Sequence, residues 1–357
     1  MSKERKIQEF VVKGKEIFIG LEDSKKTWRI CVRMEKMIIH QKSMEAEYDV
    51  LKSYLNNKFP DCKIHLVYEA GFRGFNLHDQ LTADGHNCIV VPAHKVHQEK
   101  CSRVKNDQVD ARILAKNLED GNCTFCHVPD EELRNDREIV RTLNAVQKDI
   151  KRTKSRIRMA FYKYGVKTGI TAKSWTDNHY KYVRTLELPP ILGAAMEPFY
   201  QLLDLLWKNQ KDLRNMLRGL AKKERYANAY RIARSLPGIG WLTAIRLILE
   251  LGEDFERFKS GAAIASFVGL GGSEYSTGEK IRKGGITKQG NSFVRSCLIE
   301  SAWAAIRYDP VLQDFYLRMK RNTAIAQKAI TAVARKLIVR MRSCIVNNVE
   351  YRFGVIE

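Results

Sequence analysis

A polar stretch in the C-terminal part of the chain, residues 273–291, carries side chains suited to attack on a phosphodiester. Two neighbouring hydroxyls, Ser276 and Thr277, precede Gly278. A hydroxyl can act as the nucleophile, and nearby cations can offset the negative charge that develops on the phosphoryl group. The cations that follow are Lys280, Arg282, Lys283 and Lys288. A solvated basic hairpin with a Ser/Thr turn is the alternative interpretation.

Acidic residues near the N-terminal end form a second set of candidates. Glu22 and Asp23 end one predicted strand, and Glu69 ends another. Asp107 and Asp110 are three residues apart on a predicted helix, so they share one helical face. If these carboxylates converge, they would bind Mg²⁺ or Mn²⁺, which prefer oxygen ligands and can stabilise a phosphodiester under attack. Acids are also common at strand ends and helix starts without any metal.

Glu22 and Asp23 cannot both serve such a site in a regular strand. Adjacent strand residues face opposite sides of the sheet, so only one of them reaches the metal unless the strand has a bulge. The residues themselves leave this choice open.

The surrounding pattern predicts a mixed α/β sheet for the N-terminal part, because strands come first and then alternate with helices. The predicted strands cover residues 16–23, 27–33, 34–43, 63–69 and 87–91. The predicted helices cover residues 44–57, a segment after Gly74 that carries Leu77 and Leu81, and residues 107–116.

The middle of the chain predicts two long helices, over residues 131–163 and 191–226. Apolar residues recur at about 3.5-residue spacing in the first of them, which favours a coiled-coil hairpin that separates two domains or joins two protomers. Further on, a Gly-x-Gly turn at Gly238 and Gly240 precedes an apolar helix, as in a helix-hairpin-helix that offers N–H groups to a DNA phosphate. A plain helix–helix turn is the alternative. The remaining predicted helices cover residues 262–268, 292–307 and 311–346.

Composition restricts the class of protein. The 357 residues carry a formal charge of +21, which favours a polyanionic partner, with nucleic acid the first candidate and an anionic membrane surface the competitor. No apolar run approaches the roughly 18 residues of a membrane span, and no signal-peptide core follows Met1, so we expect a cytoplasmic location. The eight cysteines are too scattered for a disulfide scaffold, and the Cys123–Cys126–His127 cluster has no second pair at zinc spacing.

Six segments in this order resemble the bridge-RNA-guided, DEDD-type insertion-sequence transposases. They are residues 20–25, 68–71, 104–111, 236–240, 267–270 and 273–291. The resemblance covers nearly the whole chain. It implies an RNase H/RuvC-like α/β domain (residues 1–128), a helical coiled-coil linker (129–230) and an all-α serine transposase domain (231–357) that contains the helix-hairpin-helix.

The same resemblance implies residue roles and partners. The acidic tetrad corresponds to Glu22, Glu69, Asp107 and Asp110 and would hold Mg²⁺ or Mn²⁺, although the family usually has Asp at the first position. The nucleophilic serine of the family falls on Thr277, whereas chemistry favours Ser276 because a β-methyl crowds the approach to phosphorus. A covalent protein–DNA ester, donor and target DNA, a noncoding guide RNA and a homodimer or homotetramer follow from the family.

Two other functions remain as alternatives. A metal-dependent nuclease or junction resolvase would use the tetrad alone and form no covalent adduct. A nucleic-acid-binding protein with altered acids would bind in a salt-sensitive manner and break no strand.

Overall fold

The computed structural model describes residues 12–92, 95–96, 106–167, 175–274, 276–277 and 282–353. The chain divides into two compact units, Met1–Val128 and Pro129–Glu357. The long helices of the second unit share a core with its C-terminal helices.

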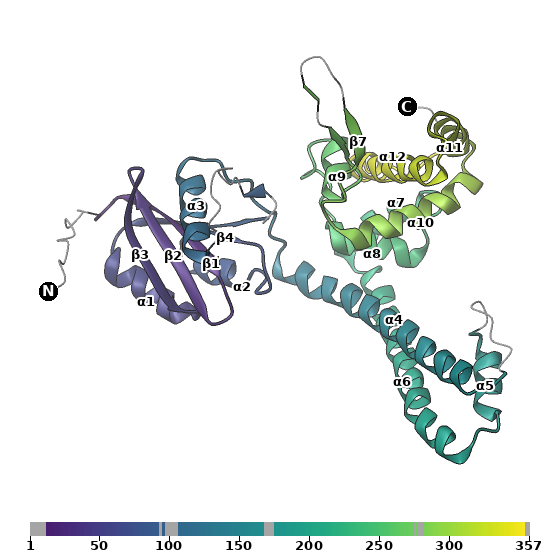
Figure 1. Cartoon of the computed structure of the whole chain (residues 1–357). Helices are drawn as coiled ribbons and strands as arrows, with labels where there is room; N and C mark the ends of the chain where they lie inside the picture. Colours follow the sequence, from purple (N-terminus) through teal and green to yellow (C-terminus); the bar gives the residue numbers. More distant parts are fainter. Residues whose placement is uncertain are drawn as a thin grey trace. The chain divides into compact units, whose positions relative to one another are not determined.

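The first unit is a five-stranded mixed sheet with helices, which confirms the predicted mixed α/β class (Figure 1). The strand order is β3-β2-β1-β4-β5, with β1–β2 and β2–β3 antiparallel and β1–β4 and β4–β5 parallel. The strands are β1 (Glu16–Asp23), β2 (Thr27–Met34), β3 (Met37–Glu45), β4 (Lys63–Glu69) and β5 (Asn87–Val91), and the helices are α1 (Tyr48–Lys58), α2 (Asn76–Ala83) and α3 (Asp107–Glu119).

Alternating side chains of β1 divide between the two faces of this sheet. Ile17, Ile19 and Leu21 join the larger core, which includes buried leucines of α1 and α2. Phe18 on the other face packs with Leu114 of α3. The period-two alternation of β1 therefore sets which residues meet α3.

The second unit begins with a pair of long helices, α4 (Glu131–Lys163) and α6 (Pro190–Leu220), which pack against each other (Figure 1). Their distal halves form a separate core that includes Ile157, Leu203 and the short helix α5 (Asp177–Thr185). Their proximal halves contribute Leu133 and Leu217 to the main core of the unit. This shared core is the physical reason that the hairpin and the C-terminal helices form one unit.

The rest of the second unit is helical apart from a short hairpin. The elements are α7 (Glu224–Ser235), α8 (Trp241–Leu251), α9 (Gly261–Phe267), β6 (Gly272–Glu274), β7 (Lys283–Ile286), α10 (Ser292–Tyr308), α11 (Pro310–Thr323) and α12 (Ala326–Val346). The prediction of one helix over residues 311–346 was wrong. Ala324 adopts a left-handed conformation (φ 55°), which ends α11 and lets it pack on α12.

Within the described part of the chain, no helix combines the length and apolarity that a membrane crossing requires. The cysteines of that part, Cys123 and Cys126 among them, are free thiols.

Candidate functional site

Two acidic residues lie side by side at the ends of neighbouring parallel strands. The register of β1 and β4 pairs Leu21 with Tyr68, so the next residues along the strands are Glu22 and Glu69. Val67 lies two residues before Glu69, and Phe18 lies four residues before Glu22; both pack with α3. Strand residues separated by an even number of positions share a face of the sheet. Both carboxylates therefore face the side of the sheet that α3 covers.

Helix α3 brings two further acids to this face because it lies unusually close to β1. A Cβ atom at Gly20 would lie 2.1 Å from the carbonyl oxygen of Ala111 and 2.4 Å from the amide nitrogen of Ala115, so only glycine fits. Asn106 caps the helix, since its side chain accepts a hydrogen bond from the amide of Val109. Asp107 and Asp110 occupy the first turn of this helix.

The pKa of Glu22 reflects the other carboxylates near it. The pKa of Glu22 is raised from 4.5 to about 7, first by burial and then by the negative charges of Glu69, Asp110, Asp107 and Asp23, in that order. Burial and like charges both disfavour the ionised form. A cation among these carboxylates would relieve that cost.

Asp23 lies in a different environment from its neighbour. Its side chain is only 6% exposed and its Oδ1 accepts hydrogen bonds from Trp28 Nε1 (2.7 Å) and Arg73 Nε (2.8 Å). Arg73 also donates to the backbone oxygens of Ser24 and Lys25. The structure thus gives Asp23 a structural ion pair on the face opposite Glu22, so of the two alternatives Glu22 is the one that faces the other acids.

The donor set fits a divalent cation in chemical type. Glu22, Glu69, Asp107 and Asp110 offer the carboxylate oxygens that Mg²⁺ and Mn²⁺ prefer. Among the residues that the structure describes, however, no three His, Cys, Asp or Glu side chains are grouped closely enough to hold a metal ion. Asp107 is instead paired with Arg29, at 3.7 Å between Oδ2 and Nε.

The polar stretch in the second unit forms the short antiparallel hairpin of β6 and β7. Ser276 and Thr277 are both exposed beyond β6. The Ser276 hydroxyl donates to Oε1 of Glu274 (2.6 Å) and accepts from the backbone N–H of Arg282 (3.2 Å). Ser276 therefore has a carboxylate partner that can take its proton.

Of the cations expected around this loop, Arg282 and Lys288 are exposed. Gly278 and Lys280 lie outside the described residues, as does the side chain of Lys283.

The base of this loop is tightly fixed. A Cβ at Gly290 (φ 123°) would lie 2.1 Å from the carbonyl oxygen of Phe267. Asn291 caps α10 through its side-chain oxygen and donates from Nδ2 to Oε2 of Glu250 (2.8 Å). Glu250, whose side chain is 4% exposed, also pairs with Arg141 of α4 (3.4 Å). Helices α4, α8 and α10 thus hold the C-terminal end of the loop.

The two glycines of the predicted helix-hairpin-helix have different roles. Gly238 (φ 74°) packs against α10, where a Cβ would meet the carbonyl oxygen of Ser301 at 2.2 Å. Gly240 is the N-cap of α8 and is exposed, with open space where a Cβ would lie. Close packing against α10 alone explains why residue 238 is glycine, whereas Gly240 leaves the start of α8 accessible.

Comparison with known proteins accounts for both regions at once. Residues 19–165 match a protein-family profile that is described as a transposase. The name of this profile contains DEDD and IS110. A second profile, described as the transposase IS116/IS110/IS902 family, matches residues 230–317. Both matched segments are therefore similar to those of IS110-family transposases. The four acids of the first unit lie in the first match, and Gly238, Gly240, Ser276 and Thr277 lie in the second.

Individual members of the family cover different shares of the chain. The y4qE protein of Sinorhizobium fredii, named as a candidate transposase, is 29% identical over 69% of this chain. The transposase for insertion sequence element IS1533 of Leptospira borgpetersenii is 26% identical over 71% of it. The chain spans 60% of the length of the first protein and 74% of the second.

Three residues of these sites were missed by sequence reasoning. Arg29 pairs directly with Glu22 in the β1–β2 register, and strand alternation would have placed it on the same face. Phe72, three residues after Glu69, is 61% exposed. Glu274 lies two residues before Ser276 and accepts its hydroxyl hydrogen bond, so the period-two spacing of a strand could have indicated this contact.

Proposed function

We propose that this chain cuts and rejoins DNA strands of an insertion sequence, with a RuvC-like carboxylate site in the first unit and a hydroxyl nucleophile in the second. The observation that carries the proposal is the placement of Glu22, Glu69, Asp107 and Asp110 on the α3 side of the sheet. Burial and the negative charges of neighbouring acids disfavour the ionised form of Glu22, and a bound cation would offset that cost.

The sheet supports a fold of the RNase H/RuvC type. Three antiparallel strands lead into two parallel ones, and the first strand lies at the centre. The ends of β1 and β4 then present acids at one edge, which matches the general tendency of sites to form at the carboxyl ends of parallel strands.

Glu22, Glu69, Asp107 and Asp110 would hold Mg²⁺ or Mn²⁺. When bound, such an ion stabilises the negative charge of the phosphoryl group under attack. Arg29 pairs with Asp107 and lies opposite Glu22 in the register, so it keeps a positive charge beside these acids.

Ser276 is the proposed nucleophile. Its Oγ forms a bond to phosphorus, the bond between phosphorus and the 3′-oxygen breaks, and the 3′-oxygen takes up a proton. The hydroxyl proton of Ser276 passes to the carboxylate of Glu274, which already accepts it in a hydrogen bond. The product is a protein–DNA phosphoester with a free 3′-hydroxyl, and reversal of the attack by another strand's 3′-hydroxyl rejoins DNA without a nucleotide cofactor.

Thr277 is the competing nucleophile, because the family's serine falls on that position. Its hydroxyl is exposed, as is that of Ser276. The hydrogen bond with Glu274 distinguishes the two, since a hydroxyl needs a proton acceptor to attack.

Exposed cations support DNA as the partner. Lys320, Arg321, Lys328 and Arg335 of the α11–α12 region are exposed, and within the described residues none of them is in an ion pair. Arg282 and Lys288 add charge at the loop, and Gly240 leaves backbone N–H groups of α8 open to a phosphate. Phe72, three residues after Glu69, is exposed and suits stacking on an unpaired base.

A guide RNA and an assembly of two or four copies complete the proposal. The net charge of +21 is enough to neutralise many phosphates, and the long basic helix α4 offers a backbone-reading surface. In this scheme base pairing of the RNA selects the DNA sites, and the protein binds the duplex by its shape.

A second function is hydrolysis by the carboxylate site alone. The DEDD designation of the matching profile favours it, because that name refers to the acids and not to a serine. In this case water attacks the phosphodiester and Ser276 has no part in the reaction.

One experiment separates the two functions. The full chain is incubated with Mg²⁺, DNA that carries the insertion-sequence ends, and RNA transcribed from the element, and the products are run on a denaturing protein gel. We expect labelled DNA linked to protein, lost in Ser276→Ala and retained in Thr277→Ala. Loss only in Thr277→Ala would transfer the role to Thr277. Cut DNA without any linked protein would establish hydrolysis instead.

A further inference from the structure

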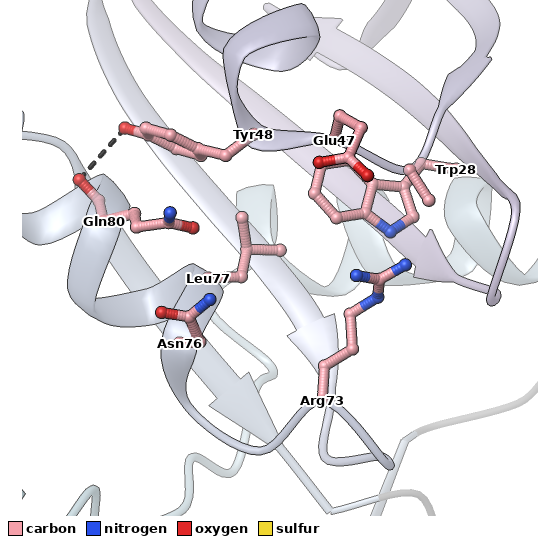
Figure 2. Close-up of a pocket in the computed structure, with 8 residues that line it drawn as sticks. Trp28, Glu47, Tyr48, Arg73, Asn76, Leu77 and Gln80 are labelled. Atoms are coloured by element: carbon pink, nitrogen blue, oxygen red, sulfur yellow. Dashed lines mark hydrogen bonds between the residues drawn. The ribbon is translucent and has the colours of Figure 1, made fainter.

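A pocket of about 200 Å³ lies on the α1/α2 side of the sheet in the first unit, opposite the acids (Figure 2). Its wall consists of the start of β2 and the β3–α1 junction on one side and the start of α2 on the other. The lining residues are Trp28, Ala46, Glu47, Tyr48, Arg73, Asn76, Leu77 and Gln80. The pocket is large enough for one planar ring system and has no role in the proposed strand cutting.

The lining combines an apolar floor with unused polar groups. Trp28, Ala46 and Leu77 form the apolar part of the lining and are almost fully buried. The carboxylate of Glu47 and the amides of Asn76 and Gln80 also line it. Among the described residues, none of these three side chains has a hydrogen-bond partner in the protein. The hydroxyl of Tyr48 does donate to Gln80, but to its backbone oxygen and not to its side chain.

The pocket is rigid because Arg73 connects its parts. The guanidinium lies 5.3 Å from the ring centroid of Trp28 and 5.4 Å from that of Phe72. It also binds the buried carboxylate of Asp23 at the end of β1. The pocket therefore adjoins the end of β1 that carries Glu22 on its other face.

From these contacts we propose that the pocket binds a single unpaired guanine base of the nucleic acid. Guanine presents two adjacent N–H donors, N1–H and the 2-amino group, which a carboxylate such as that of Glu47 accepts together. The amides of Asn76 and Gln80 can donate to its O6 and N7 acceptors, and the ring would lie against Trp28 and Leu77. The proposal rests on the proposed function in one respect, that nucleic acid is the substrate.

The charge of Glu47 argues against a phosphate as the occupant. A phosphate would have to approach this carboxylate, and Arg73 already neutralises Asp23. Adenine and cytosine each offer one amino donor next to a ring acceptor on the pairing edge, so neither satisfies a carboxylate with two hydrogen bonds.

The test measures binding and not cleavage. Fluorescence anisotropy in EDTA compares the affinity of the full chain for short single strands of thymine that carry one central guanine, inosine or adenine. We expect the guanine strand to bind about tenfold more tightly than the all-thymine strand, which is the discrimination of one good bidentate contact. Inosine, which lacks the 2-amino group, should lose most of this preference.

The decisive variant is Glu47→Gln, which replaces one acceptor oxygen with a donor and should reduce the guanine preference to near one. Glu45→Gln is the matched control, because Glu45 is exposed on the same segment but does not line the pocket. Circular dichroism checks that both variants fold. A guanine preference that survives Glu47→Gln, or binding of the strands by the unmodified protein without such a preference, would overturn the proposal.

A second measurement separates this proposal from the proposed function. Saturation-transfer NMR compares free guanosine with thymidine as ligands. Guanosine binding that Glu47→Gln abolishes, together with no binding of any strand, would support the pocket and count against the function as a DNA enzyme. Strand binding without discrimination among the bases, and no guanosine binding, would overturn the pocket alone.

Discussion

The carboxylate site and the serine loop are built in opposite ways. Glu22 and Glu69 end strands inside a five-stranded sheet, and α3 is pressed against that sheet at Gly20. Ser276 lies on an exposed two-stranded hairpin that packed helices hold only at its base. The first arrangement positions charge before any ligand arrives, whereas the second presents a reactive atom at the surface. The proposed function uses both arrangements, an accessible hydroxyl and a preorganised charge cluster.

Loss of one acid of the first site should affect strand cutting more than any other change considered below. Asp110→Asn should lower the rate of strand cutting at least about 100-fold, because a preorganised charge that acts on the reacting phosphate is lost. The measurement is single-turnover cleavage of labelled DNA in Mg²⁺. Asp120→Asn is the matched control, since Asp120 is exposed at the other end of α3 and should leave the rate unchanged. Equal rates in both variants would remove the carboxylates from the reaction.

The loop base provides the next test. Asn291→Ala should lower the free energy of unfolding of the second unit by about 2 kcal/mol, because α10 loses its cap and buried Glu250 loses a hydrogen bond. Urea denaturation followed by far-UV circular dichroism measures this change. Ser260→Ala, which removes only the cap of α9, should cost about 1 kcal/mol. If the two variants lose the same stability, the bond to Glu250 does not hold the loop.

Glu22 should make the stability of the first unit depend on pH, although more weakly than the changes above affect cutting or folding. Its pKa in the folded protein is about 7 and its ordinary value is 4.5, so the native state holds the proton more tightly. The stabilisation from this group is complete below about pH 4.5 and is lost as the pH rises through 7. Glu22→Gln, which cannot ionise, should therefore melt at about the same temperature as the unmodified protein at pH 4.5. At pH 8 in EDTA it should melt about 2 to 4 °C higher, because solvent around this half-buried side chain screens most of the effect.

Differential scanning calorimetry across this pH range measures the Glu22 effect. Glu35→Gln serves as a control in an exposed position of the same unit, with no effect expected from the acid cluster. A Glu22→Gln variant that is no more stable than the unmodified protein at pH 8 would mean that the acids are not crowded.

The sequence predicts the first site better than the second. Strand alternation and strand ends place Glu22 and Glu69, and helical spacing pairs Asp107 with Asp110, because these relations depend on local geometry alone. The hydrogen bond from the backbone N–H of Arg282 to Ser276 joins the two arms of the loop, and local preferences do not determine it. For the same reason the break at Ala324 was missed, since neither glycine nor proline marks it and tertiary packing of α11 on α12 decides it.

Gly20 has a consequence for how the acids of the first unit can vary. The distance between the strand-borne carboxylates and the helix-borne ones is set by the contact of two backbones, with no side chain between them. A single methyl group at this position would push α3 outward and carry Asp107 and Asp110 away from Glu22 while every acid remained in the sequence. A chain could therefore keep all four carboxylates and still lose its site through the smallest possible substitution.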